Sequence, residues 1–245
     1  SSGRPVIRAF VRVIHNFTRQ SAQDNDVGKQ AMKQLWEDHK PLIIIIAVVD
    51  VPGNVASAHA VLIFRPIEIF QVNIAHAGFA SGLPIQGQCE PPDDPRWYQR
   101  MKQAGIDTLG MHIEAVSQSV REQIMPGKAT VTVDHYLTAF EQAVAVFGRG
   151  QVSTYILYGL GDTREAVLAM SEKLIALGVY PFVVPFVPIA GTPLETRRSP
   201  DAAEMRELLA PLGRMLVTGG LKSAEIKAGC GKCGACSSLS AYEKA

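Results

Sequence analysis

From Leu83 onward, short apolar segments alternate with longer amphipathic ones, and this alternation restricts the possible folds more than any other feature. The segments expected to be strands are LPIQGQCE (83–90), IDTLGMHIE (106–114), QVSTYILYG (151–159) and VYPFVVPFV (179–187). Helical sequence follows each of them. Successive strands joined by amphipathic helices run parallel in one sheet. The sequence therefore predicts an α/β domain, either a barrel or an open doubly wound sheet.

Residues that favour helix ends mark the connections between these strands. The expected N-caps are Asp94, which precedes a proline at the first helical position, Ser117, Asp134 and, in a capping-box-like pair with Glu165, Asp162. Gly178 should end the helix before the last strand. Ser199 and Pro200 open the last helical region, where Pro211 should cause a kink or a break.

The first part of the chain, residues 1–82, has a less regular pattern and is treated as a separate α/β region. Its longest apolar run, PLIIIIAVVDV (41–51), is interrupted by Asp50 and is shorter than the roughly 20 residues that span a bilayer. We expect a buried parallel strand there. A helix around 29–39 and apolar residues at 61–69 would add one or two further units. The strand–helix units then occupy 83–220, and a cysteine-rich tail occupies 221–245.

Charge and cysteine content restrict the function classes. The net charge of +1 gives no electrostatic sign of binding to nucleic acid or membranes. The N-terminal segment lacks the uncharged apolar core and the cleavage site of a secretory signal. Four cysteines, three of them clustered, do not make a disulfide framework for 245 residues. We therefore expect a cytoplasmic protein that has no nucleic-acid or membrane partner.

Carboxylates and glycines stand where the predicted strands end. Glu90 follows the first of the four strands, Glu114 ends the second, and Gly159, Gly161 and Asp162 follow the third. Parallel α/β folds collect their chemistry at this edge of the sheet. A carboxylate there can accept hydrogen bonds from ribose hydroxyls or from an amino group, as in dinucleotide sites. These five residues are the candidate cofactor-binding residues.

Each carboxylate also has a structural explanation. Asp162 can cap its helix, and Glu90, which precedes two prolines, can be a solvated loop residue. Glu114 ends an apolar strand, where an unpaired carboxylate would be costly to bury, and this favours a functional role. His112 more often corresponds to a packed histidine than to a ligand. The GLGDT segment lacks the dinucleotide fingerprint and a phosphate-loop lysine.

Three of the four cysteines, Cys230, Cys233 and Cys236, lie in the segment AGCGKCGACSSL. The C-x2-C-x2-C spacing brings three thiolates onto one tight turn, which the intervening glycines permit. It matches the first part of a ferredoxin-type run, which normally includes a fourth cysteine. A structural zinc also needs a fourth nitrogen or sulfur ligand. The spacing predicts a metal or cluster site whose fourth ligand lies elsewhere, and iron–sulfur and zinc both stay open.

Taken together, these segments resemble the radical SAM superfamily, in particular its biotin-synthase-related branch and an uncharacterised bacterial subfamily associated with nitrilase gene clusters. The segments that carry the resemblance are LPIQGQCEPPDD, AGIDTLGMHIEAVSQSVREQIMPGKA, GRGQVSTYILYGLGDTREAVLAMSEKLIALGVYPFVVPFVPIAGTPLE and IKAGCGKCGACSSLSAYE, within 83–243. The resemblance implies a partial (βα)6 TIM-type barrel that is incomplete at its N-terminal side. The four predicted strands would be barrel strands three to six.

The resemblance also implies cofactors and roles. Such enzymes hold a [4Fe–4S] cluster through three cysteines, and one open iron binds S-adenosylmethionine (SAM), whose reductive cleavage gives a 5′-deoxyadenosyl radical. By position, Glu114 matches the acidic residue that meets the SAM ribose. YILYGLGD, with Gly159, Gly161 and Asp162, resembles the motif whose backbone meets the adenine. An electron donor such as flavodoxin or ferredoxin and an unidentified small-molecule substrate would be the partners.

One departure from the family pattern is large. The C-x3-C-x2-C motif expected after the first barrel strand is absent, and Cys89 is the only cysteine between Ser1 and Gly229. Three explanations stay open. The N-terminal part is a truncated or misread version of the family's, or it is a replacement that has lost catalysis. In the third, the C-terminal cysteines supply the cluster. Whether the chain is an enzyme therefore stays open. The alternatives are a non-catalytic zinc- or cluster-binding partner protein on a degenerate barrel and a metal-free aldolase or isomerase. The latter lacks the strand-end lysine that it would need.

Overall fold

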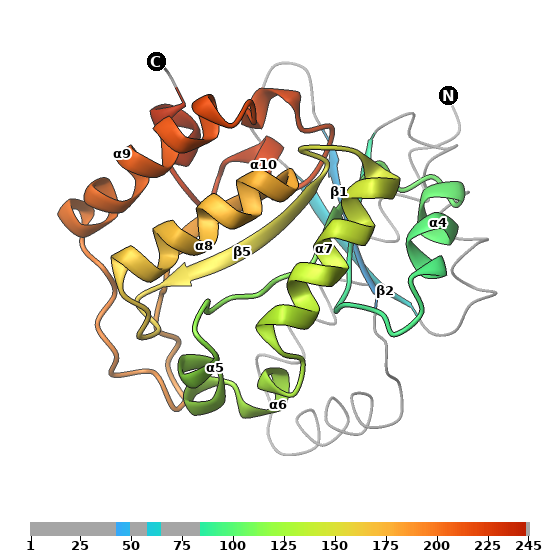
Figure 1. Cartoon of the computed structure of the whole chain (residues 1–245). Helices are drawn as coiled ribbons and strands as arrows, with labels where there is room; N and C mark the ends of the chain where they lie inside the picture. The colour runs from blue at the N-terminus through green and yellow to red at the C-terminus, as the bar shows by residue number, and fades with distance from the viewer. Residues whose placement is uncertain (1–42, 50–57, 65–83, 244–245) are drawn as a thin grey trace.

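The computed structural model describes residues 43–49, 58–64 and 84–243 (Figure 1). The described strands form one sheet in the order β2-β1-β3-β4-β5-β6. They are β1 Ile43–Val49, β2 Ala58–Phe64, β3 Ile85–Gln88, β4 Thr108–Gly110, β5 Val152–Tyr158 and β6 Val179–Pro185. Neighbours from β3 to β6 pair in parallel. The predicted α/β class, with four parallel strands alternating with helices, is confirmed and is consistent with a partial barrel.

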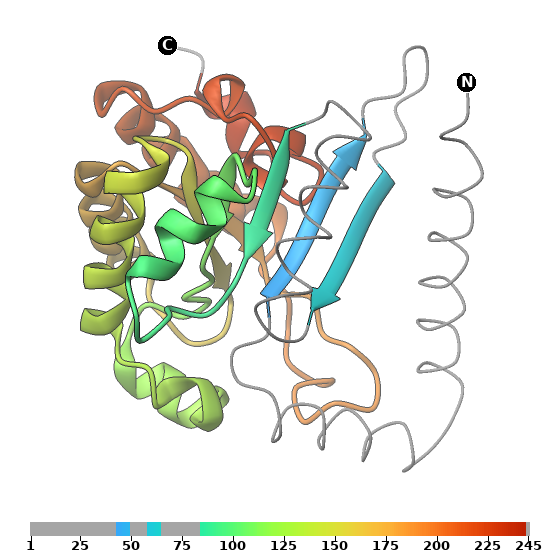
Figure 2. The ribbon, with the colours of Figure 1, turned by 90° about the vertical axis from the view of Figure 1, so that its right-hand side faces the viewer.

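The longer helices cover one face of this sheet (Figures 1 and 2). The helices, including two 3₁₀ turns (η), are α4 Arg96–Gln103, α5 Gln118–Ile124, α6 Pro126–Ala129, α7 Val133–Phe147, α8 Arg164–Leu177, α9 Ala202–Thr218, η1 Ser223–Glu225, α10 Cys230–Cys233 and η2 Leu239–Tyr242. Helix α7 contacts β4 and β5, α8 contacts β5 and β6, and α4 and α9 flank them. None of these described helices is long and apolar enough to cross a membrane.

The two N-terminal strands differ from the prediction in direction. The apolar run at 41–51 does form a strand, β1, but β1 runs antiparallel to both β2 and β3, as the arrows in Figure 2 show. Residues 50–57 join β1 to β2, and this link is shorter than the dozen or more residues that a parallel crossover needs. The expected parallel arrangement of this segment is therefore wrong. The helix expected around 29–39 lies outside the described residues.

Two predicted N-caps are wrong by one or two positions. Helix α7 is capped by Thr132 rather than Asp134, and α8 by Thr163 rather than Asp162. In each case the threonine hydroxyl accepts a hydrogen bond from the backbone N–H three residues later. Threonine and aspartate are both good caps, so a pair of them close together leaves the helix start ambiguous. Gly178, in the left-handed conformation, ends α8 as predicted.

The other helix ends agree more closely with the sequence. Helix α4 begins one residue later than expected, after Pro95, while the Asp94 carboxylate accepts a hydrogen bond from the Arg96 N–H at 3.0 Å. Ser117 stands at the N-cap position of α5, although its side chain makes no capping hydrogen bond. Helix α9 starts with a capping box of Asp201 and Glu204 and continues through Pro211 as one helix. The predicted break there does not occur.

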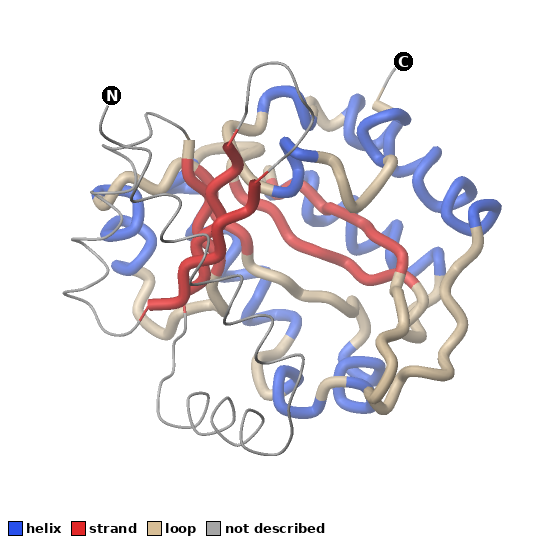
Figure 3. The backbone as a smooth tube through the Cα atoms, turned by 180° about the vertical axis from the view of Figure 1, so that it is seen from behind, coloured by secondary structure: helices blue, strands red, loops and turns tan. Residues whose placement is uncertain are grey.

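The C-terminal segment lies against the opposite face of the sheet (Figure 3). The Thr108 hydroxyl of β4 donates to the carbonyl of Ala228 at 3.3 Å, and the Ser237 hydroxyl donates to the carbonyl of Val183 in β6 at 2.6 Å. Beyond them, the phenol of Tyr180 hydrogen-bonds to Glu243. The cysteine-bearing tail is therefore held on the sheet, on the side away from α7 and α8.

Candidate functional site

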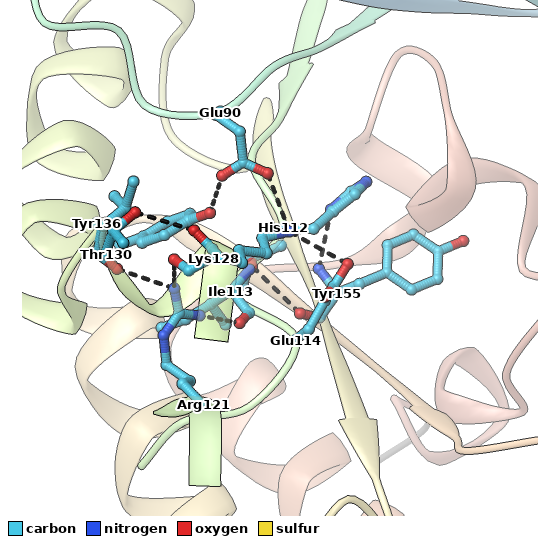
Figure 4. Close-up of polar contacts among 12 residues, drawn as sticks. Glu90, His112, Ile113, Glu114, Arg121, Lys128, Thr130, Tyr136 and Tyr155 are labelled. Carbon is cyan, nitrogen blue, oxygen red and sulfur yellow. Dashed lines mark hydrogen bonds and ion pairs between the residues drawn. The ribbon is translucent and has the colours of Figure 1, made fainter. Parts of the chain in front are cut away.

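Two of the predicted carboxylates meet at the carboxyl ends of neighbouring strands (Figure 4). Glu90 follows β3 and Glu114 follows β4, and the ammonium of Lys128, from α6, lies between them. The Lys128 Nζ is 3.0 Å from Glu90 Oε1 and 3.2 Å from Glu114 Oε1. The side chains of Glu90 and Glu114 are 37% and 31% exposed and that of Lys128 is 19% exposed. This edge of the sheet, formed by Glu90, Glu114 and Lys128 and called the rim below, is therefore partly open to solvent. The parallel register predicted from sequence thus brings Glu90 and Glu114 together.

The backbone of Glu114 is held in an unusual conformation. Among the described residues it is the only non-glycine residue with a positive φ, at 63°. The Ala115 N–H donates to the Ile113 carbonyl at 2.8 Å, which closes a three-residue turn around Glu114. Strand β5 fixes this turn, because the Glu114 N–H donates to the Tyr155 carbonyl at 2.9 Å and its carbonyl accepts from the Leu157 N–H at 2.7 Å. Such strain persists only where the surroundings impose it, and it is concentrated at functional sites.

A fully buried arginine holds the loop that follows β4. The side chain of Arg121, in α5, is 0% exposed. Its guanidinium donates to the carbonyl of Ile113 and, at 3.0 and 2.9 Å, to the carbonyls of Lys128 and Val131. It also lies over the ring of Tyr136, 5.0 Å from the ring centroid. Arg121 therefore ties the residue before Glu114 to the segment that carries Lys128.

Glu90 is fixed from a second side by α7. The hydroxyl of Tyr136 donates to Glu90 Oε2, while Lys128 approaches Oε1. Tyr136 itself is 0% exposed. Burial and the neighbouring Glu90 carboxylate raise the pKa of the Tyr136 phenol well above its usual value, so it stays a hydrogen-bond donor at neutral pH. Both oxygens of Glu90 therefore have partners within the protein.

His112 is part of the packing behind this rim. Its Nδ1 accepts a hydrogen bond from the Tyr155 N–H at 3.2 Å, and its ring packs edge-on against the Tyr155 ring, with centroids 4.7 Å apart. Burial and the charge of Lys128 lower the pKa of His112 to about 3. The imidazole is therefore neutral at physiological pH, in agreement with the structural role that the sequence favours for it.

The residues after β5 have mainly backbone roles. The φ of Gly159 is 112°, and a Cβ at this position would lie 2.9 Å from Pro200, so both conformation and space require glycine. Gly161 also has a positive φ, 134°. The Asp162 carboxylate accepts hydrogen bonds from the N–H groups of Val116, at 2.7 Å, and Ser117, at 3.0 Å. Asp162 therefore joins the loop after β5 to the loop after β4 and does not cap α8.

The three C-terminal cysteines lie on the other face of the sheet. Cys230 and Cys233 are the first and last residues of the single turn α10, and Cys236 follows it. Burial and the neighbouring Cys230 and Cys236 thiols raise the pKa of the Tyr155 phenol. Burial also raises the pKa of the Cys230 thiol. None of the three thiols is in a disulfide.

As arranged, these cysteines do not form a ligand set for a metal. Within the described part of the chain, no three or more His, Cys, Asp or Glu side chains converge as metal ligands would. The sulfur atoms therefore do not fit a cluster or a zinc ion as they stand. A metal or cluster at Cys230, Cys233 and Cys236 stays a prediction, and no chemical step is derived through it.

Sequence reasoning missed Lys128, Arg121 and Tyr136. Lys128 lies in a Pro-Gly-Lys turn and resembles an ordinary surface lysine, and Arg121 lies on a short polar helix. Tyr136 contacts Glu90 across 46 residues of sequence. No local pattern marks such contacts, because they arise only when the loops after β3 and β4 meet. An arginine within ten residues of a strand-end glutamate is too common to be a signal by itself.

Comparison with known proteins gives partial matches. No family model matches the chain. It is 30% identical over 122 residues to a bacteriochlorophyllide c C-7(1)-hydroxylase of Chlorobaculum limnaeum, a match that spans 49% of this chain and 30% of the relative. It is 26% identical over 140 residues to a probable dual-specificity RNA methyltransferase RlmN of Rhodopirellula baltica, across 56% of this chain and 38% of the relative. The chain thus has distant homology to radical SAM enzymes over about half its length.

Proposed function

We propose that this chain forms the SAM-binding part of a radical SAM enzyme of the biotin-synthase-related branch, in which SAM is cleaved reductively to a 5′-deoxyadenosyl radical. The distant homology to radical SAM enzymes supports the superfamily. The observation that best supports a SAM-binding site is the strained backbone of Glu114 at the rim of the parallel strands, where β5 and Arg121 hold it. The proposed substrate is a small molecule.

The proposed roles follow from where the residues lie. Glu114 accepts hydrogen bonds from the ribose hydroxyls of SAM, because its carboxylate is at the carboxyl end of the sheet and partly exposed. The backbone at Gly159 and Gly161 meets the adenine, and Asp162 holds that loop in place through Val116. Glu90 completes the rim beside Glu114.

An iron–sulfur cluster would supply the electron for this cleavage, and a flavodoxin or ferredoxin would deliver that electron to it. Cys230, Cys233 and Cys236 would have to rearrange to bind a cluster, since they do not converge as described. The matched region spans only 30% and 38% of the two relatives, so it does not account for their whole length. We therefore assign to the described residues the binding of SAM and not the generation of the radical.

Equilibrium binding of SAM to wild type and to Glu114→Gln tests this proposal. Loss of a hydrogen bond to an ionised acceptor should weaken SAM binding roughly tenfold or more. Glu172→Gln, on the exposed surface of α8, is the matched control and should bind like wild type. Wild-type protein that does not bind SAM refutes the proposal. Iron and sulfide loading under anaerobic conditions, followed by dithionite, tests cleavage: iron uptake without cleavage contradicts the enzymatic half.

A second candidate is a non-catalytic zinc- or cluster-binding partner protein on a degenerate barrel. The observation that favours it is that Cys89 is the only cysteine in residues 1–229, so the SAM-cluster motif is not found in this chain. Metal analysis of purified protein separates the two candidates, because one zinc and no iron favours the partner protein. Cys233→Ser should then lose metal and unfold more easily; loss of metal without loss of stability contradicts a structural metal.

A further inference from the structure

The two rim carboxylates are not equivalent in their contacts. Glu90 has a partner for each oxygen, Lys128 for Oε1 and the Tyr136 hydroxyl for Oε2. Glu114 has Lys128 for Oε1, and no described residue donates a hydrogen bond to its second oxygen. Each oxygen of Glu90 thus has a partner inside the protein, while one oxygen of Glu114 has no hydrogen-bond donor among the described residues.

The charges of Glu90, Glu114 and Lys128 favour the contact of the ammonium with both carboxylates. Lys128 is the one cation that contacts both carboxylates among the described residues, so the three groups together carry one net negative charge. The titratable groups that face them are His112 after β4, Tyr136 from α7, Cys89 next to Glu90, and Arg121 from α5, which lies over Tyr136. His112, Tyr136 and Cys89 are neutral at pH 7, because burial shifts the pKa of each in the direction that disfavours its charged form.

The backbone fixes both ends of the Lys128–Glu114 contact. One guanidinium, that of Arg121, binds the carbonyl of Ile113, directly before Glu114, and the carbonyl of Lys128 itself. Strand β5 fixes Glu114 from the other side. The ammonium and the carboxylate are therefore held in place by the fold and do not depend on a ligand to bring them together.

We propose that Lys128 is a positioning and specificity residue, anchored by Glu90, that makes Glu114 an acceptor for neutral hydroxyls and excludes ammonium groups. The proposal rests on the nucleoside-binding function given above and names the chemistry of that contact. A hydroxyl donor at the second oxygen of Glu114 completes its hydrogen bonding without adding charge. A ligand ammonium in the same place would lie beside the Lys128 ammonium and would be repelled.

A nucleoside pair tests this directly. Adenosine presents two neutral ribose hydroxyls, and 3′-amino-3′-deoxyadenosine presents an ammonium when mildly acidic buffer protonates its amine. Calorimetry should show that wild type prefers adenosine roughly tenfold or more. Lys128→Met keeps the aliphatic stem and removes the charge, and should abolish or reverse this preference. Lys128→Arg restores a cation and should recover it, which a loss of packing alone would not explain.

Further variants separate anchoring from ligand contact. Lys173→Met, on the exposed surface of α8, is the matched control and should keep the wild-type preference. Glu90→Gln should weaken the preference through Lys128, so the double variant Glu90→Gln with Lys128→Met should be no worse than Lys128→Met alone. Circular dichroism and thermal unfolding of every variant confirm that the rim is compared in folded protein.

The outcomes distinguish this inference from the proposed function. A preference for adenosine that Lys128→Met removes and Lys128→Arg restores supports both. Binding of both nucleosides with the same preference in wild type and Lys128→Met overturns the role of Lys128 and leaves nucleoside binding standing. Binding of neither nucleoside to wild type overturns the proposed function and, with it, the ligand class assigned to Glu114.

Discussion

Replacement of Arg121 by methionine should destabilise the protein more than any surface arginine substitution. The guanidinium is 0% exposed and donates to three backbone carbonyls. Hydrogen bonds from a charged donor contribute about 1.5–3 kcal/mol each. Part of this stabilisation is not lost, because the variant no longer buries a charge, nor the Arg121 Nε, which has no hydrogen-bond partner among the described residues. We expect a net loss of about 3–5 kcal/mol, because three buried carbonyls lose their donor, each at a cost of about 1–3 kcal/mol.

The measurement is urea unfolding followed by circular dichroism. With a slope of about 2 kcal/mol per molar urea, a loss of about 3 kcal/mol lowers the midpoint by roughly 1.5 M. Arg164→Met is the matched control, since Arg164 is 41% exposed and pairs with the surface carboxylates of Glu165 and Glu207; it should cost at most about 1 kcal/mol. Arg121→Lys keeps a charge but not the planar fork, and should fall between the two.

An Arg121→Met midpoint that falls no further than that of Arg164→Met would refute this account. The three carbonyls would then be hydrogen-bonded equally well without the guanidinium, and the loop after β4 would not depend on it. A loss of stability in Arg121→Met together with unchanged SAM binding in the folded fraction would limit Arg121 to folding. We expect both stability and binding to fall, because the Ile113 carbonyl directly precedes Glu114.

Two further predictions use other parts of the fold. Gly213→Ala should destabilise the protein by about 1–3 kcal/mol and make the half-buried Cys230 more reactive to thiol reagents, because the new Cβ would lie 2.3 Å from the backbone oxygen of Tyr242. Gly127→Ala, with nothing within 4 Å of the new Cβ, is the control and should be neutral or slightly stabilising in urea. His112 has its pKa lowered to about 3, so the unfolded chain binds a proton that the folded one does not as pH falls from about 6.5 to 3, and stability should drop by up to about 1.4 kcal/mol per pH unit. Unfolding midpoints across this range should fall less steeply in His112→Gln, and an unchanged slope would contradict the assignment.

The parallel strands could be predicted from sequence because their signals are local. Each of β3 to β6 is a short apolar segment followed by an amphipathic helix, and a right-handed crossover then fixes their order. The direction of β1 could not be predicted in the same way. Its apolar run fits a buried strand of either direction, and only the short link through 50–57 to β2 favours the antiparallel arrangement.

The candidate site could be predicted only in part. The strand ends placed Glu90 and Glu114 at one edge, because parallel strands end together. Lys128 and Tyr136 reach that edge from α6 and α7, which the sequence pattern places only roughly. The helix cap expected at Asp162 is wrong for a similar reason: its carboxylate accepts hydrogen bonds from the N–H groups of a loop 45 residues or more away, and not from those of its own helix.

Strand β5 connects the two regions that the sequence singled out separately. Its backbone at Tyr155 and Leu157 holds Glu114, and the Tyr155 N–H donates to His112. The side chain of the same tyrosine lies near Cys230 and Cys236, whose thiols raise the pKa of its phenol. Glu114 and the cysteine segment therefore both lie against one residue of one strand. A rearrangement of the cysteines that moved the Tyr155 ring would therefore act on the strained turn at Glu114, because the Glu114 N–H donates to the Tyr155 carbonyl.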